Sequence, residues 1–292
     1  MLQNVSEPES TISKKHMNTA AGNCLICSGT DVHIIEKCKT GFNVMKCLHC
    51  GLVFVSPHPR KELIESAHAD DYYAPWLQDQ RSMRVHMWDK RLNTLNRLSV
   101  QKGRLLDVGC AEGLFLEQAA HDGWEVTGTE ISSFAVRHCK EKLGLNVMQG
   151  ELADIKFPDS AFHAVTMWHV LEHTPDPIAV LREIRRILKY DGVFVMAIPN
   201  LHNILSQYAY RLIKGRRIHL FDPDDRELHL YHFTPETIRL ASEKAGFSVQ
   251  KIVPDMGIVQ WHIKGLNYIA AAGSRLIGKI ITDAIEVHLR PS

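Results

Sequence analysis

Three features that are scarce or missing limit the classes of protein to which this 292-residue sequence can belong. It has no apolar run long enough to cross a membrane, so we expect no transmembrane helix. Neither sign of charge dominates, because 34 Lys and Arg residues offset 33 Asp and Glu residues and leave a net charge of +1. We therefore expect no broad nucleic-acid-binding surface, and nucleic acid is not a favoured partner. Internal repeats and long low-complexity segments are also missing, and the length suffices for one substantial core with appendages.

The N-terminal region lacks the apolar segment of a secretory signal peptide. Residues 1–20 are polar, which is typical of a disordered leader. We expect a cytoplasmic protein whose isolated cysteines remain free thiols.

Cysteine is scarce, yet four of the seven cysteines form two Cys-x-x-Cys pairs, nineteen residues apart. Each pair turns two thiolates toward one point, and two pairs complete a tetrahedron around zinc. Gly51 follows the second pair and helps its tight turn. We predict a zinc ribbon over residues 21–60 with a structural Zn²⁺, since four thiolates leave no position for water. The predicted ligands are Cys24, Cys27, Cys47 and Cys50.

Two alternatives to this metal site remain open. Disulfide-linked loops are one, which the missing signal peptide disfavours. Cys38 and His49 could substitute as ligands, but neither has a partner at the same spacing.

A glycine turn follows the apolar run that starts at Leu105. Gly109 and Gly113 bracket the turn, and Glu130 follows Gly109 by twenty-one residues. Such a turn between a strand and a helix allows close approach of a nucleotide cofactor, and a carboxylate at the end of the next strand can accept hydrogen bonds from ribose hydroxyls. Simple packing glycines are the structural alternative.

The spacing of the turn decides between two cofactors. A dinucleotide site needs a third glycine, which is missing, and Asp107 would repel a pyrophosphate but attract an ammonium group. The run resembles motif I of the class I S-adenosylmethionine-dependent methyltransferases, D-x-G-x-G-x-G, with Ala111 at the middle glycine position. The segments that follow also match the order of elements in this family.

The resemblance implies an α/β Rossmann-like fold with a mostly parallel seven-stranded sheet and helices on both faces. The alternation of short apolar strands with amphipathic helices favours the same architecture. Expected elements include a helix over Ser132–Leu143, a helix over Ile178–Leu188, a turn at Asp191–Gly192 and a strand over Val193–Ile198.

The resemblance also implies a set of cofactor-binding residues. Glu151 would lie near the adenine, although it could instead cap the next turn, and Trp168 could equally belong to the core. Tyr73, in an aromatic segment, would touch the methionine portion or pack between ribbon and core. The full set is Tyr73, Asp107, Gly109, Cys110, Ala111, Gly113, Glu130, Ile131, Glu151, Leu152 and Trp168.

Three histidines are candidates for action on the methyl acceptor. A hydroxyl acceptor needs a base, and a positioned imidazole serves this purpose. His173 is the first choice and His169 the second, because both follow the strand that ends beside the acceptor in the resembled family. His232, with His229, lies in the loop before a helix whose expected N-cap is Thr234.

The remaining segments complete the expected domain organisation. Residues 61–100 form a helical lid or connector, 101–256 the methyltransferase domain with an insertion at about 200–230, and 257–292 an amphipathic helical tail. Apolar residues from Leu266 onward recur at helical spacing. They indicate packing on the domain, a homodimer interface or peripheral membrane contact, and the mixed charge of the polar face disfavours the last.

We expect methyl transfer to a small-molecule acceptor, such as a sugar nucleotide or glycan precursor. The segment Cys47–Pro57 resembles a ribbon pattern that precedes some sugar methyltransferases. O-methylation is favoured, because sugar C-methyltransferases of the resembled group carry a further C-terminal domain. The alternatives are an RNA methyltransferase using basic residues within Arg81–Arg91 and Lys214–Arg217, and a non-catalytic cofactor-binding adaptor.

Overall fold

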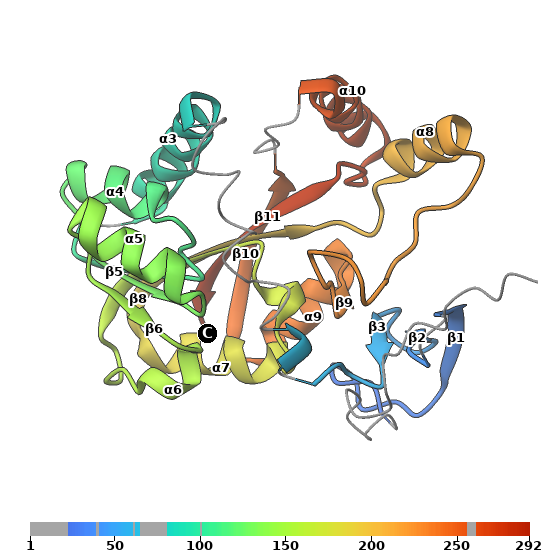
Figure 1. Cartoon of the computed structure of the whole chain (residues 1–292), viewed down its shortest axis with the longest axis horizontal. Coiled ribbons are helices and arrows are strands. Elements are labelled where there is room, and N and C mark those ends of the chain that lie inside the picture. The colour runs from blue at the N-terminus through green and yellow to red at the C-terminus, as the bar shows by residue number, and fades with distance from the viewer. Residues whose placement is uncertain (1–22, 39–40, 61, 65–80, 100, 256–260) are drawn as a thin grey trace, which may run out of the picture.

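The structure is a computed structural model that describes residues 23–38, 41–60, 62–64, 81–99, 101–255 and 261–292. Figure 1 shows a central sheet flanked by helices, with a small second sheet beside it. The predicted leader and Tyr73 lie outside the described residues. Within the described ranges, none of the helices has the length and apolar character needed to cross a membrane.

The central sheet has seven strands in the order β10-β11-β8-β7-β4-β5-β6. Strands β4 to β8 pair in parallel, whereas β11 runs antiparallel to both β8 and β10. This mostly parallel arrangement confirms the predicted fold class. The strands are β4 (Arg104–Val108), β5 (Glu125–Glu130), β6 (Val147–Gln149), β7 (Phe162–Trp168), β8 (Leu188–Pro199), β10 (Phe247–Pro254) and β11 (Ala284–Pro291).

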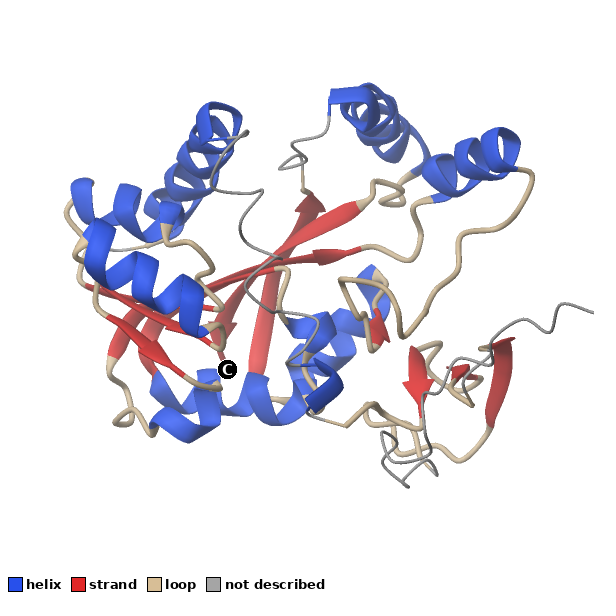
Figure 2. Ribbon diagram, in the orientation of Figure 1, coloured by secondary structure: helices blue, strands red, loops and turns tan. Residues whose placement is uncertain are grey.

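Helices cover both faces of this sheet, as Figure 2 shows. Successive side chains of a strand point to opposite faces. Leu105 accordingly packs in a buried cluster with Phe115 of α4, while Leu106 belongs to a cluster with Ile184 of α7. One face carries α3 (Arg81–Leu98), α4 (Leu114–His121) and α5 (Ser133–Leu143), and the other α6 (Leu152–Ile155), α7 (Pro177–Ile187) and α9 (Pro235–Lys244).

Side-chain caps fix where several helices begin. The Asp176 carboxylate accepts a hydrogen bond of 2.9 Å from the Ala179 N–H at the start of α7. Thr234 and Thr237 form a reciprocal capping box at the start of α9, which confirms the predicted N-cap. These helices therefore begin at positions that the local sequence specifies.

The N-terminal ribbon forms a four-stranded antiparallel sheet with a strand of the main domain. Its order is β1 (Val32–Lys37), β2 (Asn43–Cys47), β3 (Val53–Ser56) and β9 (Tyr231–His232). The Val55 N–H donates to the Leu230 carbonyl at 2.8 Å, and Lys244 donates to two ribbon carbonyls. Because ribbon and domain share one hydrophobic cluster, the ribbon holds the segment before α9 in place.

The predicted helical tail is wrong beyond residue 277. Helix α10 covers Trp261–Ile277 and stops at Gly278, which adopts a positive φ of 67°. Strand β11 follows and inserts between β8 and β10. Its buried apolar residues alternate with Glu286 and His288, which bond each other at 2.6 Å. This period of two identifies a strand, so the sheet needs residues beyond the expected domain boundary at 256.

The insertion after β8 contains one helix, α8 (Ile204–Lys214), none of whose residues is buried. It contacts α10, and the two helices project together from the body of the molecule in Figure 1. The expected turn at Asp191 and Gly192 is instead part of β8, where the pairing with β7 shifts register.

Candidate cofactor and acceptor site

The glycine turn lies at the carboxyl edge of the central sheet, directly after β4. Gly109, Ala111 and Gly113 all have positive φ, of 70°, 49° and 80°. The N–H groups of Gly109 and Cys110 donate to the Thr129 carbonyl at 2.8 and 3.0 Å. The turn is thereby tied to the end of β5, and α4 begins immediately after Gly113.

Close protein packing explains both glycines. A Cβ on Gly109 would lie 2.4 Å from a methyl carbon of Val170, and a Cβ on Gly113 would lie 2.7 Å from the Cys139 Sγ. Gly113 therefore admits helix α5. Gly109 lets the segment after β7 approach the turn, which brings the ends of β4 and β7 together.

Glu130 ends β5 and is buried. Its carboxylate accepts hydrogen bonds from the Ala111 N–H at 3.0 Å and the Ser132 N–H at 2.9 Å. A carboxylate thus stands at the glycine turn, where the resemblance places the ribose of the cofactor. Ile131, half-buried, follows it.

Asp107 is a buried carboxyl group within β4. Its burial raises the pKa to about 8, against the opposing effects of a 2.7 Å hydrogen bond from Thr166 and the charge of Arg91. A cation beside Asp107 would favour the ionised form. The residue therefore suits a positively charged ligand.

The other predicted cofactor residues occupy different environments. Glu151 is exposed at the N-cap position of α6 but makes no side-chain cap hydrogen bond, and Leu152 is buried. Trp168 is buried among Trp88 and Phe115, with ring centroids 6.0 and 5.4 Å away. This placement favours the core interpretation of Trp168.

Helix α3 supplies two buried arginines that the sequence did not distinguish from surface residues. Arg84 pairs with Glu112 in the glycine turn at 2.6 Å. Arg91 pairs with Asp255 at 2.6 Å, and its guanidinium lies 4.5 Å from the Trp168 ring centre. These two arginines form buried ion pairs beside the carboxyl edge of the sheet. They therefore cannot contribute to the basic surface that RNA binding would need.

His169 follows β7 in a left-handed conformation, with a φ of 56°. Its ring lies 3.3 Å from the Arg91 guanidinium and 3.5 Å from the Asp255 carboxylate. Although desolvation lowers the pKa of His169, the carboxylates of Asp255 and Glu172 raise it to about 9. About 40% of the His169 side chain is exposed at this edge of the sheet.

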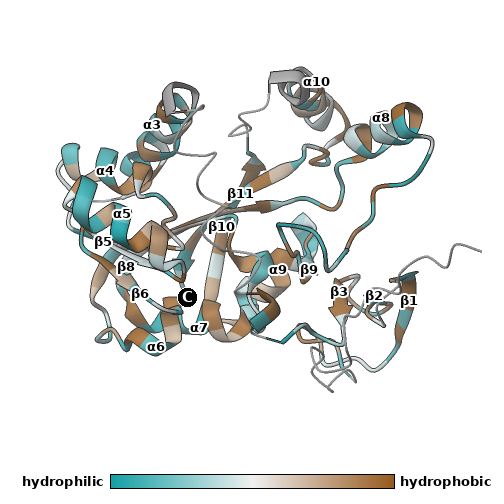
Figure 3. Ribbon diagram, in the orientation of Figure 1, coloured by the Kyte–Doolittle hydropathy of each residue, from teal (hydrophilic) through white to brown (hydrophobic). Residues whose placement is uncertain are grey.

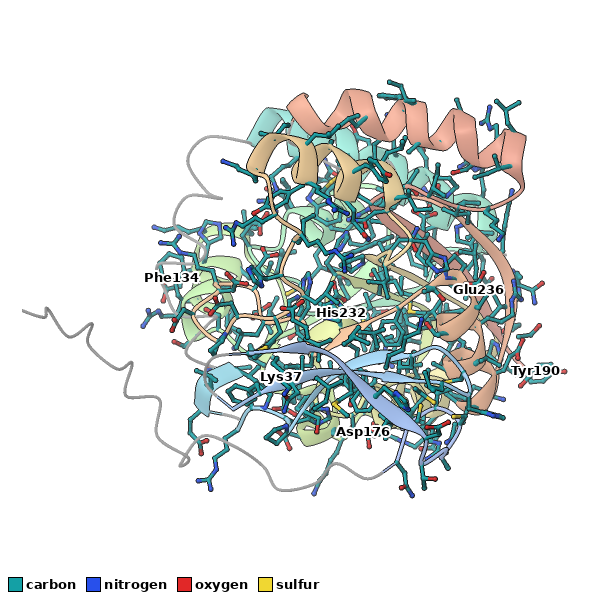
Figure 4. The ribbon with its side chains drawn as sticks, turned by 90° about the vertical axis from the view of Figure 1, so that its right-hand side faces the viewer. Lys37, Phe134, Asp176, Tyr190, His232 and Glu236 are labelled. Atoms are coloured by element: carbon teal, nitrogen blue, oxygen red, sulfur yellow. The ribbon has the colours of Figure 1, made fainter. Side chains whose placement is uncertain are left out.

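Four polar side chains lie close together just after His169, around the 3₁₀ helix that follows β7. Glu172 and His173 lie on the 3₁₀ helix η2 (Leu171–His173), and His229 and His232 come from the segment before α9. The rings of His173 and His229 are 4.8 Å apart, and those of His229 and His232 are 6.2 Å apart. Burial lowers the pKa of His232 to about 3. Figure 4 shows His232 just above the ribbon strands.

The four ribbon cysteines converge on one point. Their sulfur atoms lie within 4.8 Å of one another, with 3.4 Å between Cys24 and Cys50 and 3.5 Å between Cys27 and Cys47. All seven cysteines are described and none forms a disulfide. Cys38 lies outside the cluster and donates to the Phe221 carbonyl. The geometry fits one tetrahedral metal ion, and each Cys-x-x-Cys pair supplies two ligands.

A family model described as a methyltransferase domain matches residues 77–252, which is more than half of the chain. The chain belongs to this methyltransferase-domain family. The match covers the glycine turn, Glu130 and the four polar side chains Glu172, His173, His229 and His232.

Relatives in this family include ubiquinone biosynthesis O-methyltransferases. The protein of Pseudomonas fluorescens is 28% identical over 185 residues, which cover 61% of this chain and 75% of that protein. The protein of Actinobacillus pleuropneumoniae is 34% identical over 107 residues, which cover 33% of this chain and 46% of that protein. The chain therefore spans just under half the length of the latter relative.

Solved methyltransferases share the fold. One is a methyltransferase of Haloferax volcanii in complex with its Trm112 activator, with a TM-score of 0.54 and 20% identity over 76% of this chain and 96% of that one. Another is an S-adenosylmethionine-dependent methyltransferase of Thermotoga maritima, with a TM-score of 0.53 and 17% identity over 79% and 99% of the two chains. At these identities the likeness concerns the fold alone.

Proposed function

We propose that this methyltransferase-family protein transfers a methyl group from S-adenosylmethionine to a hydroxyl oxygen of a small molecule. The observation that carries the proposal is the buried Glu130 carboxylate held against the glycine turn by two backbone N–H groups. The matching family and the O-methyltransferase relatives support the same activity.

The residues at the sheet edge fit S-adenosylmethionine. Glu130 offers carboxylate oxygens for ribose hydroxyls, and Asp107 suits the positive charge. Gly109, Cys110, Ala111 and Gly113 would form the turn around the cofactor, with Ile131, Glu151 and Leu152 on the adenine side. Bound there, S-adenosylmethionine would supply an electrophilic methyl group on a sulfonium sulfur.

The acceptor would lie beside the segment that follows β7. Val170 contacts the glycine turn, so His169 and His173 are close to the cofactor side of the sheet. We assign His173 the chief role, as the base that takes the hydroxyl proton or as the residue that orients the acceptor. Its Nδ1 lies 3.0 Å from the Leu228 carbonyl, which can only accept, so Nδ1 carries the proton and Nε2 is left with its lone pair. His169 and His232 flank this position.

Alignment would supply most of the acceleration. Holding an acceptor oxygen in line with the methyl group is worth roughly 7–11 kcal/mol. The rigid framework of ribbon, β9 and η2 suits this role, because the Leu230 N–H donates to the Glu172 carbonyl at 2.8 Å and thereby joins the two acceptor-side segments.

Two acceptor classes deserve direct comparison. The ubiquinone biosynthesis O-methyltransferases among the relatives point to a hydroxyl group of a ubiquinone precursor, and the ribbon pattern points to a sugar nucleotide. Incubation with S-adenosylmethionine and each acceptor class, with mass spectrometry of the products, tests the activity. Methylated product that depends on His173 supports the proposal, and intact cofactor binding with no product from any acceptor favours the adaptor alternative.

Three further features belong to the proposal. The ribbon would hold one structural Zn²⁺ through Cys24, Cys27, Cys47 and Cys50. The isolated cysteines Cys38, Cys110 and Cys139, which form no disulfide, suit a cytoplasmic location. RNA is the less favoured acceptor, because Arg84 and Arg91 of the first expected basic cluster are buried. The second cluster, Lys214, Arg216 and Arg217, is exposed. Measuring acceptor binding at increasing salt concentration separates an RNA acceptor from a small-molecule acceptor. Contacts to RNA phosphates weaken steeply with added salt.

The outward side of α10 would be covered by a second copy of the chain. Ala270 and Ser274 face inward, but Ile269, Leu276 and Ile277 are exposed, Leu276 to 88%. Figure 3 shows further apolar stretches on the neighbouring α8. Light scattering should give a dimer that Leu276→Glu converts to a monomer. Binding to anionic lipid vesicles by a monomer would instead assign the surface to a membrane.

A further inference from the structure

We infer that Glu172, His173 and His229 form a binding site for one divalent transition-metal ion at the acceptor side of the sheet. The inference rests on the proposed function for its chemistry but on the geometry of these three residues for its location. It concerns a second metal site, separate from the four cysteines of the ribbon.

The three side chains already converge. One ligand atom from each, a carboxylate oxygen and two imidazole nitrogens, lies within 4.8 Å of the other two. Glu172 and His173 are adjacent on η2, and His229 is brought to them by the segment that pairs with the ribbon. Only a small contraction would be needed for all three atoms to reach coordination distances of about 2.0–2.2 Å from a common ion.

The Glu172 carboxylate carries the strongest indication. The residue is 1% exposed, and neither oxygen accepts a hydrogen bond from any residue that the structure describes. The nearest imidazole nitrogens are His169 Nδ1 at 3.7 Å and His173 Nε2 at 4.0 Å, which are within ion-pair range but too far for hydrogen bonds. A buried carboxylate without donors is costly unless it is paired or coordinates a metal ion.

The imidazole of His173 is oriented as a metal ligand requires. Its Nδ1–H donates to the Leu228 carbonyl, so the Nε2 lone pair points toward Glu172. Fixing the tautomer of a ligating histidine through a backbone carbonyl is the usual supporting arrangement around metal sites.

The ligand set selects the class of ion. Two imidazoles and one carboxylate suit Zn²⁺, Fe²⁺, Mn²⁺ or Co²⁺ and leave open coordination positions. The acceptor hydroxyl would occupy one of them, lose its proton to water more readily, and then attack the methyl carbon. The new O–C bond forms as the C–S bond breaks, and the electron pair of that bond returns to sulfur. His173 would then act on the acceptor through the ion.

Metal counting on the full-length protein tests this inference. Elemental analysis after loading with Zn²⁺ should give about two ions per chain, falling to about one for His229→Ala and for the isosteric Glu172→Gln. His202→Ala, which removes a half-exposed histidine outside the cluster, should keep both ions. Cys24→Ser should remove the ribbon ion instead.

Cobalt provides a second readout that does not depend on turnover. Titration of metal-free protein with Co²⁺ should give two phases, one with thiolate charge-transfer absorption and one without, and only the second should vanish in His229→Ala. His229→Ala and Glu172→Gln are compared so that a folding defect in one does not decide the test. The circular dichroism spectrum of each variant must match that of the parent. A single thiolate phase in the parent, or equal metal counts in parent and both variants, would overturn the inference.

The outcome is separable from the proposed function. Binding of S-adenosylmethionine is measured on the same variants without any acceptor. Loss of one metal ion in a protein that binds no S-adenosylmethionine would leave the metal site standing while the methyl-transfer proposal fails. If the parent binds S-adenosylmethionine but holds only the ribbon ion, the methyl-transfer proposal stands and the second metal site is excluded.

Discussion

Replacing Gly113 with alanine tests whether the glycine turn is fixed by backbone conformation and packing together. The φ of 80° at Gly113 lies in the left-handed region, where a non-glycine residue costs roughly 1–2 kcal/mol. The added Cβ would also lie 2.7 Å from Cys139 Sγ and 3.0 Å from a Leu145 methyl carbon. Overpacking of this kind costs about 1–3 kcal/mol. We therefore expect Gly113→Ala to lower the free energy of unfolding by about 2–5 kcal/mol.

Ala111→Gly is the matched control, because Ala111 already occupies the left-handed region with a φ of 49°. Relief of its strain is largely offset by the greater flexibility of glycine in the unfolded chain, so the change should stay within about 1 kcal/mol. Thermal and denaturant unfolding measure both variants, and Gly113→Ala should lower the Tm by about 5–15 °C. Equal stabilities of Gly113→Ala and the parent would refute the packing argument for this turn.

Three further predictions concern the acceptor residue, the buried acid and the ribbon. His173→Ala should lower turnover by roughly 10²–10⁴-fold while S-adenosylmethionine affinity is unchanged; unchanged turnover in steady-state assays would remove His173 from the acceptor site. Folded Asp107 keeps its proton up to about pH 8, whereas an unfolded aspartate loses it near pH 4. The native state therefore binds more protons in this window, so stability should fall as pH rises from about 4 to about 8. Asp107→Asn should flatten this slope in denaturant titrations, and an unaltered slope would assign it to other groups. Cys24→Ser should release the ribbon zinc and lower the Tm, since metal-binding free energy contributes directly to the folding of such sites. Full zinc retention by this variant would contradict the four-cysteine site.

Much of the fold could be predicted because its signals are local. The glycine turn, the spacing to Glu130 and the alternation of strands with helices depend on residues close together in sequence. The start of α9 could likewise be predicted, because Thr234 forms a capping box with Thr237, three residues later. The two Cys-x-x-Cys pairs place four cysteine sulfur atoms close together, because each pair forms its own tight turn.

The strand β11 could not be predicted from the same signals. Its neighbours in the sheet are β8 and β10, so it is buried on both sides, and its apolar residues continue the apolar pattern of α10. Apolar residues continue at helical spacing past Gly278. From the sequence alone, the change to the two-residue period of a strand therefore could not be recognised. Its place is fixed by pairing with β8, which is distant in sequence, and with β10, which α10 separates from it.

Long-range contacts also determined which polar residues belong to the site. Arg84 and Arg91 have the composition of a basic surface helix, but their partners Glu112 and Asp255 lie far along the chain. His229 was recognisable as one of several histidines, and its nearness to Glu172 depends on the pairing of β9 with the ribbon. Tyr73 lies outside the described residues and remains a prediction.

The most direct test of the central claim is calorimetric titration of the full-length protein with S-adenosylmethionine, alongside NAD and alongside the variants Glu130→Ala and Glu130→Gln. The account predicts binding of S-adenosylmethionine to the parent, weakened binding to both folded variants, and no binding of NAD. Binding of NAD in place of S-adenosylmethionine, or S-adenosylmethionine affinity that is unchanged without the Glu130 carboxylate, would contradict it.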